Sequence, residues 1–537
     1  MTSHSSVARA AAGMAAATAV SRGFGFVRVL VIAGVLGTTY LGNTFQASNS
    51  FSNVIFELLA AGALSAVLVP TFVDLIDRGE EPEAERLAGN VLGRALIALA
   101  VVTLVGIAAA PLIAQLLASG ANETVREQQE ALSTFLLRFV IPQVLLYALG
   151  TVAIAALYAK RRFTVTAVAP IGLTVVLVTA LILFRLQVGP GTPGLDLSTA
   201  EKLTLALGAT LGVAAFVAVP AVALHRTGFR LRPRLDRRDP AVRGLMRLSG
   251  WAVFQHSMIG ILLGTAIVIG NRVEGGVIAY QVAWVFFLAP YAVLAQPIHT
   301  TILPELSTRQ GRGDHAAFAH SLRWALDSMA MLVVPVSVAM VALAVPGMRV
   351  VAFGKAAGSG VDLLAAGVAS LATGLFFYGA FLLLARAYYA LGDSRTPALV
   401  ALVSAGAGAC VMVVLGRVVH GTAVVAALGI GHSVAYLLGA AALAIGLTRR
   451  TGRLIVPTAL VRATLLAVPL GLAAAGVARW ADPPGRIGNL ALLVVIGAVG
   501  AGLYLAGVRL TGGRMVSFRG REQSPSGLEA DSAEVDT

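Results

Sequence analysis

Two arginines, Arg22 and Arg28, interrupt the first long apolar segment, which runs from about residue 7 to residue 36. A guanidinium at mid-bilayer costs about 2.5–3.5 kcal/mol on insertion scales, so neither side chain should face lipid. Because a guanidinium donates paired hydrogen bonds to phosphate oxygens, the two predict an anion-binding site inside the membrane. Internal ion pairs, or snorkelling to the cytoplasmic interface, are the structural alternative.

The spacing of these arginines constrains the site. They are six residues apart, which is about 120° around a regular helix. A narrow stripe cannot hold both side chains, whereas a wide cavity, or a helix unwound at Gly23 and Gly25, can. We therefore expect Arg22 and Arg28 to bind an anionic substrate in a broad, wet cavity.

A carboxylate and a row of amides follow in the second apolar segment. Glu57 lies near its middle, where a carboxylate should be paired or protonated. It is either a switchable partner of the arginines, a cation-coupling site, or half of a permanent salt bridge. Asn43, Gln46, Asn49 and Asn53 recur at spacings of three to four and form one polar helical face. That face either lines the cavity or joins helices by hydrogen bonds.

Later apolar segments carry further isolated polar side chains. Each is either a substrate or coupling contact in the cavity, or a hydrogen-bond partner between helices. They are Arg138, His256, Gln281, His299 and Arg386.

Composition identifies an integral membrane protein. Of the 537 residues, 57% are hydrophobic and 12% are charged, against about 25% charged in soluble domains. The net charge of +14 resides mainly in short loops between apolar segments, as membrane topology requires, so we expect no nucleic-acid partner. The single cysteine, Cys410, excludes an internal disulfide.

Motifs for catalysis are missing from the sequence. No glycine-rich loop ends in Gly-Lys-Ser/Thr, and the eight histidines have no metal-ligand spacing. We therefore expect a transporter rather than an enzyme, without a cofactor or metal. The sequence leaves coupling to the membrane potential or to a cation open.

The fold class is an all-α polytopic membrane protein with about 14 transmembrane helices. Each apolar segment is long enough to span about 30 Å of hydrocarbon. The segments are 7–36, 45–73, 87–118, 131–159, 164–187, 200–225, 241–270, 276–305, 316–345, 361–391, 396–418, 423–447, 455–479 and 487–511.

Basic loops set the predicted orientation. They alternate along the chain, and they include 160–162, 226–238, 309–312 and 449–453. By the positive-inside rule these loops and both termini are cytoplasmic. The polar tail, 512–537, should be disordered in the cytoplasm.

An internal repeat recurs at an offset of 231–234 residues. Val-Pro70 and the later Arg-Gly79-Glu match Leu-Pro304 and Arg-Gly313-Asp, and residues 156–159 match residues 387–390. A repeat that preserves orientation contains an even number of helices, here six. The sequence therefore predicts two parallel six-helix lobes with a substrate site between them. The predicted domains are 1–226, 227–448, two accessory transmembrane helices in 449–511, and the tail.

These motifs together resemble the MurJ/MviN family of lipid II flippases, in the multidrug/oligosaccharidyl-lipid/polysaccharide exporter superfamily. The resemblance extends to about residue 511. It is carried by Ser21-Arg22-x-x-Gly25-Phe26-x-Arg28, Ala-Gly62-Ala-Leu-Ser65, Val-Pro70, Arg162-Phe163 before Ala-x-Ala-Pro170, Thr-Ile-Leu-Pro304-x-Leu-Ser307, and Thr396-Pro397.

The resemblance implies a V-shaped bundle whose last two helices form an accessory groove. It also implies alternating access that moves undecaprenyl-pyrophosphate-linked peptidoglycan precursor (lipid II) from the inner to the outer leaflet, in cell-wall biogenesis and cell shape. The setting would be the bacterial cytoplasmic membrane. Membrane lipids and cell-wall synthesis proteins would be the partners.

Departures from the family keep other functions open. The family carries an arginine where this chain has Phe56 and Glu57, and another where it has Trp284 and Val285. The alternatives are an exporter of another lipid-linked saccharide, a cation-coupled drug exporter, or a non-transporting scaffold for cell-wall assembly.

Overall fold

The structure is a computed structural model that describes residues 2–56, 62–189, 191, 193–236, 258, 260–358 and 360–511. For residues 2–15, 53, 55, 56 and 62–67 it describes the backbone alone. The described chain is helical and contains no strand. Its helices are α1 Thr2–Leu36, α2 Tyr40–Phe56, α3 Gly62–Asp77, α4 Glu81–Ala108, α5 Ala110–Ala118, α6 Glu123–Val140, α7 Gln143–Ala159, α8 Phe163–Val188, α9 Thr199–His225, α11 Gly276–Pro290, η2 Tyr291–Ala295, α12 Gln296–Gly311, α13 His315–Ala342, α14 Ala344–Val351, η3 Gly354–Ala356, α15 Gly360–Ala372, α16 Leu375–Ala390, α17 Arg395–Val418, α18 Thr422–Thr451, α19 Thr458–Ala481 and α20 Gly485–Leu510.

The polytopic all-α prediction is confirmed, whereas the count of 14 spans is not. Eleven helices in the described chain are long and apolar enough to cross a membrane. There are up to 12 if α15 and α16, which bend by 43°, form one span. The expected spans 45–73 and 241–270 both include residues outside the description, and their described parts are short helices.

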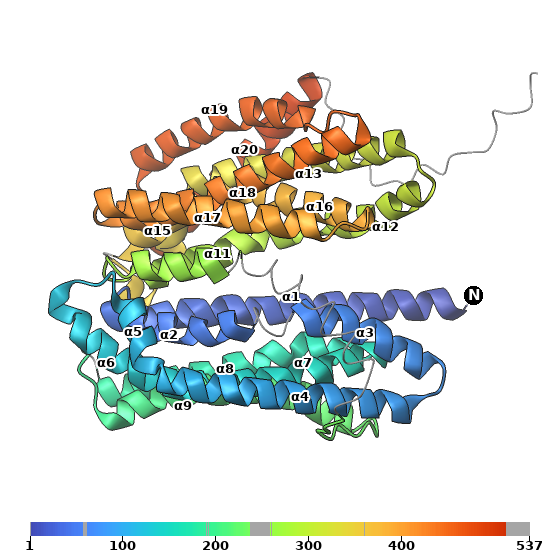
Figure 1. Cartoon of the computed structure of the whole chain (residues 1–537). Helices are drawn as coiled ribbons and strands as arrows, with labels where there is room; N and C mark the ends of the chain where they lie inside the picture. Colours follow the sequence, from blue (N-terminus) through green and yellow to red (C-terminus); the bar gives the residue numbers. More distant parts are fainter. Residues whose placement is uncertain are drawn as a thin grey trace, which may run out of the picture.

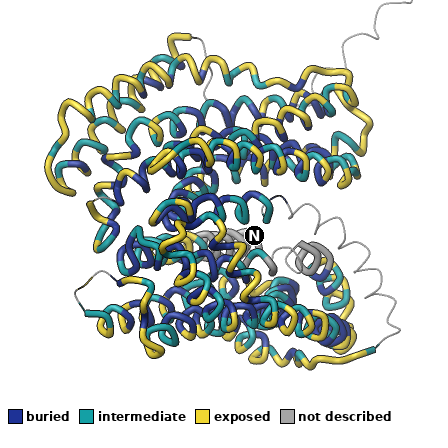
Figure 2. Tube along the Cα trace, turned by 60° about the vertical axis from the view of Figure 1, so that its left-hand side comes forward, coloured by how far each residue is buried: buried dark blue, intermediate teal, exposed yellow. Residues whose placement is uncertain are grey.

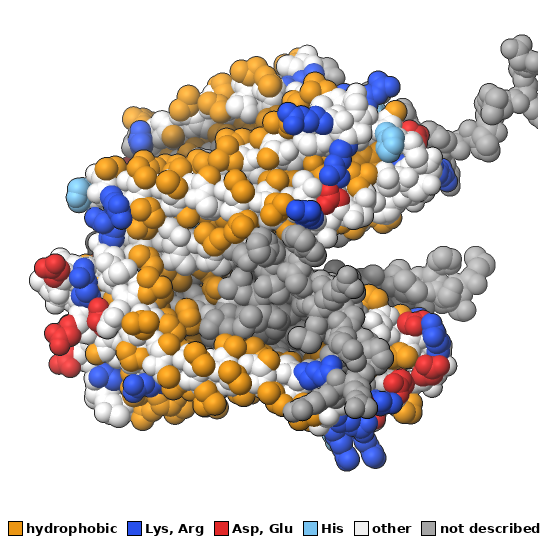
Figure 3. Space-filling view, viewed as in Figure 1, with side chains coloured by type: hydrophobic (Ala, Val, Ile, Leu, Met, Phe, Trp, Pro, Cys, Tyr) orange, Lys and Arg blue, Asp and Glu red, His pale blue; other side chains and the backbone are white. Residues whose placement is uncertain are grey.

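The helices form two groups, α1–α9 and α11–α20, which Figure 1 shows below and above one another. Buried residues fill the interior of each group, and exposed residues follow its outer helices (Figure 2). Hydrophobic side chains cover the sides of the molecule, while most charged side chains gather towards the helix ends (Figure 3). This distribution is what a bilayer around the middle of the helices requires.

Figure 3 shows the molecule hollowed between the two groups on the right, the side where Figure 1 marks the N-terminus. At the opposite end the groups meet. Gly275, in the left-handed conformation at φ +76°, packs there against the α1–α2 turn, and a Cβ at this position would lie 2.4 Å from Thr38 Cβ. Only glycine fits both the backbone angle and the space. This contact belongs to the closed end.

The internal repeat appears as matched turns. Gly79 after α3 (φ +77°) and Gly313 after α12 (φ +68°) each donate to the carbonyl three residues earlier, and the next N–H donates to the carbonyl five residues earlier. This is a Schellman termination of a helix. Arg161 after α7 and Gly392 after α16 share the same pattern. The sequence repeat is therefore a structural repeat at these turns.

Asp393 stabilises the turn between α16 and α17. Its carboxylate accepts hydrogen bonds from the Thr396 N–H (3.0 Å) and hydroxyl (2.6 Å), and from Arg450 Nη2 (2.6 Å). Burial alone would raise the pKa of Asp393, but these hydrogen bonds and the charge of Arg450 outweigh burial and hold it below the ordinary value.

The two expected accessory helices are α19 and α20, and polar contacts fasten them to α13 and α14. Asp327 accepts from the Ala459 N–H (2.8 Å) at the start of α19. Arg349 pairs with Asp482 at its end, and Arg323 donates to a carbonyl in the segment before α19. The pair is thus tied to the second helix group at both ends.

Candidate functional site

A cavity of about 460 Å³ lies between the two helix groups, and Arg28 lines it. Side chains of α1 and α2 form one wall, and side chains of α11, α16 and α18 form the other. The predicted candidates Asn49 and Gln281 line the same cavity, as does Gln46. The structure therefore brings together, from three helices, four polar residues that the sequence singled out.

A serine joins the two walls. Ser50 Oγ accepts hydrogen bonds from Gln46 Nε2 (3.1 Å) on its own helix and from Gln281 Nε2 (3.2 Å) on α11. Gln46, Asn49 and Gln281 are only partly buried, so their amides also face the cavity. The polar face predicted for the second apolar segment is thus divided between cavity lining and contact with the other helix group.

Arg28 is partly buried, and no carboxylate among the described residues lies within ion-pairing distance of it. Removing a guanidinium from water without an opposite charge costs several kcal/mol, so such a group favours an anion. Glu57, which the sequence suggested as a partner, lies outside the described residues. Its assignment stays a prediction.

Arg22 lies apart from Arg28, towards the open end. α1 is a regular helix through Gly23 and Gly25, so the unwound alternative does not occur and the arginines point about 120° apart. Arg22 Nη2 donates to Gln296 Oε1 (3.2 Å), which links α1 to α12 across the opening.

A second basic position accompanies Arg22. Gln296 follows the π-helical turn η2, a distortion that often marks functional sites. In that turn the Tyr291 hydroxyl lies 3.4 Å from His299 Nδ1, and the positive charges of Arg22 and Arg386 are both near it. Arg22, Arg386 and His299 therefore share one region near the opening, and it adjoins the Arg28 cavity, because the Tyr291 ring lies 4.8 Å from Tyr378 of the cavity lining.

Asn43 does not line the cavity; it closes the opposite end. Its Nδ2 donates to Asn271 Oδ1 (3.2 Å) and to the Val273 carbonyl (2.9 Å), and its Oδ1 accepts from the Val277 N–H (2.9 Å). Gln129 on α6 also bonds to Asn271, at 3.1 Å. We call Asn43, Asn271 and Gln129 the amide clamp. It joins α2 and α6 to the segment before α11.

The remaining candidates stand elsewhere. Arg138 is exposed in the last turn of α6 and is not among the residues that line the cavity. The side chain of Asn53, and all of His256, lie outside the described residues. Within the described chain, no cluster of three or more His, Cys, Asp or Glu side chains could hold a metal ion.

The aromatic wall of the cavity was missed by sequence reasoning. Trp284 and Tyr378 are partly exposed and line the cavity, with Tyr280, His432 and Tyr436 beside them. In the sequence they occur as two i,i+4 pairs, Tyr280 with Trp284 and His432 with Tyr436, and as the single Tyr378, in apolar helices where aromatic residues usually mean packing. Their convergence depends on how α11, α16 and α18 pack, so no local signal identifies it.

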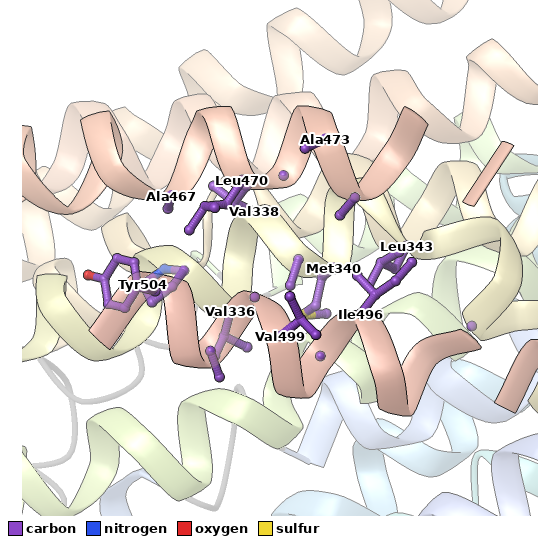
Figure 4. Close-up of a pocket in the computed structure, with 18 of the residues that line it drawn as sticks. Val336, Val338, Met340, Leu343, Ala467, Leu470, Ala473, Ile496, Val499 and Tyr504 are labelled. Atoms are coloured by element: carbon purple, nitrogen blue, oxygen red, sulfur yellow. The ribbon is translucent and has the colours of Figure 1, made fainter. Parts of the chain in front are cut away.

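A separate apolar groove of about 720 Å³ lies between the accessory helices α19 and α20 and the helices α13 and α14. Figure 4 shows Val338, Met340, Leu470, Ile496 and Val499 turned towards this space. Phe286 on α11 also lines it, while its neighbour Val285 lines the central cavity. The groove is the accessory feature that the sequence resemblance implied, and α11 separates it from the cavity.

Comparisons with known proteins agree with this architecture. The family described as lipid II flippase MurJ matches residues 32–484, a region that begins just after Arg28. A probable lipid II flippase MurJ of Vibrio cholerae is 24% identical over 395 residues, covering 72% of this chain and 73% of its own length. A relative of the same description from Rhizobium tropici is 27% identical over 385 residues, covering 71% and 70%.

Solved structures share the fold. One described as lipid II flippase MurJ in an inward closed conformation superposes with a TM-score of 0.71 at 17% identity, covering 93% of this chain and 98% of that one. An inward-facing multidrug resistance MATE family transporter of the MOP superfamily gives a TM-score of 0.62 at 13% identity, covering 80% and 94%.

Proposed function

Because the chain belongs to the lipid II flippase MurJ family, we propose that it moves lipid II, the undecaprenyl-pyrophosphate-linked peptidoglycan precursor, from the inner to the outer leaflet. The observation that carries the proposal is Arg28, a guanidinium without a described carboxylate partner in a cavity that lies between two helix groups and also holds several polar side chains. A diphosphate supplies the charge and the bidentate oxygen geometry that this group prefers.

In an alternating-access cycle, the open end of the cavity determines the side of the membrane from which the substrate enters. The hollow opens at the end that carries the N-terminus (Figure 3) and the basic turns that the positive-inside rule assigns to the cytoplasm. The amide clamp closes the other end. Our proposal is that this state accepts the lipid headgroup from the cytoplasmic side, and that breaking the clamp releases it outwards. Arg22 and Arg386 would attract the diphosphate at the mouth before Arg28 binds it.

The apolar groove provides a place for the lipid chain. Its lining is almost entirely hydrocarbon and glycine backbone, and its helices are tied to the second helix group. Since α11 borders both spaces, a substrate could hold its headgroup at Arg28 while its tail lies along α19 and α20.

Reconstitution in liposomes with labelled lipid II tests the proposal. Losing hydrogen bonds to a charged group costs about 1.5–3 kcal/mol, so Arg28→Ala should slow flipping by about tenfold to a hundredfold. Arg28→Lys should restore only part of the rate, because an ammonium lacks the planar fork. Arg138→Ala removes an arginine outside the cavity and serves as the matched control.

The proposal would be overturned if liposomes that contain the wild-type protein did not flip lipid II. It would also be overturned by an Arg28→Ala variant as active as Arg138→Ala.

A second candidate is export of another lipid-linked saccharide. Trp284 and Val285 line the cavity where the family carries an arginine, so this cavity is less positive and more aromatic. A lipid diphosphate that carries a sugar other than that of lipid II is compatible with this more aromatic wall. Flipping assays that compare lipid II with other lipid-linked sugars separate the two candidates. A drug exporter for cations is disfavoured, because no carboxylate is among the described lining residues.

A further inference from the structure

The aromatic wall of the central cavity has two layers. Trp284 and Tyr378 are partly exposed and form the layer that faces the cavity; their ring centroids are 6.3 Å apart and their planes meet at 70°. Next to them, Phe287 stacks on Trp284 at 5.4 Å, and the buried ring of His432 lies 5.2 Å from Trp284. Trp284 is thus held between neighbouring rings while it contributes to the cavity surface.

The buried layer is held rigidly by hydrogen bonds. His432 Nε2 bonds to the Tyr280 hydroxyl (2.7 Å), and His432 Nδ1 bonds to the Tyr436 hydroxyl (3.2 Å). Both ring nitrogens are therefore satisfied within the protein, and all three side chains are almost fully buried. Such support fixes the orientation of a binding surface. His432 is a positioning residue here.

A sugar ring fits this surface better than a purely apolar ligand does. A pyranose presents C–H groups on its faces and hydroxyls around its edge, so it can stack on an aromatic ring while its edge forms hydrogen bonds. The same cavity supplies the edge partners, namely the amides of Gln46, Asn49 and Gln281. Its volume of about 460 Å³ lies within the range of about 300–1,000 Å³ for small-molecule sites.

The position of Arg28 completes the arrangement. Arg28 belongs to the wall of α1 and α2, whereas the aromatic rings belong to the wall of α11, α16 and α18. A ligand that carries an anionic group beside a sugar would engage both walls at once. We propose that Trp284 and Tyr378 form a carbohydrate-stacking platform, which holds the sugar next to the diphosphate bound at Arg28.

This inference rests on the proposed function and assigns a specificity role to the aromatic wall. The platform lets the cavity distinguish a glycosylated polyprenyl diphosphate from the bare polyprenyl diphosphate. The anionic group is common to both ligands, so Arg28 cannot provide that distinction.

The test compares two ligands with purified full-length protein in detergent or nanodiscs. One is undecaprenyl diphosphate, and the other is undecaprenyl diphosphate carrying the disaccharide. Trp284→Ala should weaken binding of the glycosylated ligand by about tenfold, which corresponds to about 1.4 kcal/mol. It should leave the bare diphosphate within about twofold. Trp284→Phe keeps a ring and should retain most of the affinity.

Two further variants separate a specific effect from a general one. Trp324→Ala removes a tryptophan that is 39% exposed on α13, away from the cavity, and should change neither affinity. Arg28→Ala should weaken both ligands equally.

Equal losses for both ligands in Trp284→Ala would overturn the platform and leave an ordinary packing role for the ring. So would full affinity for the glycosylated ligand in that variant. If the wild-type protein binds neither ligand, the proposed function fails instead.

Discussion

The amide clamp makes a prediction that separates conformational control from simple stability. Asn43→Ala removes three buried hydrogen bonds, at 2.9, 2.9 and 3.2 Å. It leaves the Val277 N–H without its partner, whereas the Val273 carbonyl keeps the Gly276 N–H and Asn271 Oδ1 keeps Gln129. One unsatisfied buried group costs about 1–3 kcal/mol, and each of the two other lost hydrogen bonds costs about 0.5–1.5 kcal/mol. Allowing for water that enters the site, the closed end loses about 2–4 kcal/mol.

The consequence follows from where these bonds lie. They connect α2 to the segment before α11 and to the first turn of α11, so they exist only while the two helix groups touch at this end. A loss of about 2–4 kcal/mol raises the ratio of open to closed states by about 30-fold to 700-fold. A state populated at about 1% would then become comparable with the closed state.

A single reporter cysteine measures this shift. Ala47 is 1% exposed on α2 and packs with Val277 behind the clamp. On a Cys410→Ser background, Ala47→Cys should react slowly with an impermeant thiol reagent, and Asn43→Ala should accelerate the reaction at least about tenfold. Asn489→Ala is the matched control. That buried amide donates to the Gly485 carbonyl at the start of α20 (2.7 Å) and to the Pro483 carbonyl just before it (2.9 Å), and both bonds are local.

An unchanged labelling rate in the Asn43→Ala variant would refute the reasoning, because the clamp would then not hold the end closed. An equal acceleration in Asn489→Ala would also refute it, since it would indicate general loosening of the bundle.

Three other predictions address the closed end, the groove and the helix turns. Gly275→Ala introduces both an unfavourable φ and a Cβ clash, so it should accelerate labelling of the same reporter. Ala473→Trp should fill the apolar groove and slow flipping of the full-length lipid more than of a short-chain analogue, whereas Leu472→Trp, beside the groove, should not. The pKa of Asp393 is lower in the folded protein than its ordinary value of 3.8. The ionised carboxylate therefore contributes its full stabilisation above pH 3.8, and this stabilisation is lost as the pH falls through the lowered pKa of the folded state. The melting temperature of Asp393→Asn should consequently fall less on acidification than that of the wild type.

Sequence patterns predicted much of the fold because membrane spans and helix ends are encoded locally. The accessory helices, the repeated turns and most spans lie where hydropathy and glycine placement indicated. The sequence also indicated that polar side chains in apolar helices should face the protein interior, because they must avoid lipid. Arg28, Asn49 and Gln281 do line one cavity.

Other features depend on contacts between distant segments. The sequence prediction places Asn43 and Asn49 on one polar helical face, yet they are six residues apart, about 120° around the helix, and Asn43 enters the clamp whereas Asn49 lines the cavity. Periodicity identifies a face and not the depth at which the other helix group meets it. The 120° between Arg22 and Arg28 was visible in the sequence, but the partners of Arg22 were not, because Gln296 lies 274 residues away.

The asymmetry of the cavity suggests why two walls serve a transporter. Arg28 stands on the first helix group and the aromatic platform stands on the second. A ligand that binds both walls stabilises the conformations in which the two helix groups approach each other at the cavity. The size of this effect is set by how much more tightly the ligand binds those conformations than the ones in which the groups are apart. A bare diphosphate would engage only the first wall and would contribute less to that approach. On this argument the sugar is a specificity element and also part of what drives the conformational change, so Trp284→Ala should reduce turnover of the glycosylated substrate even at concentrations that saturate binding.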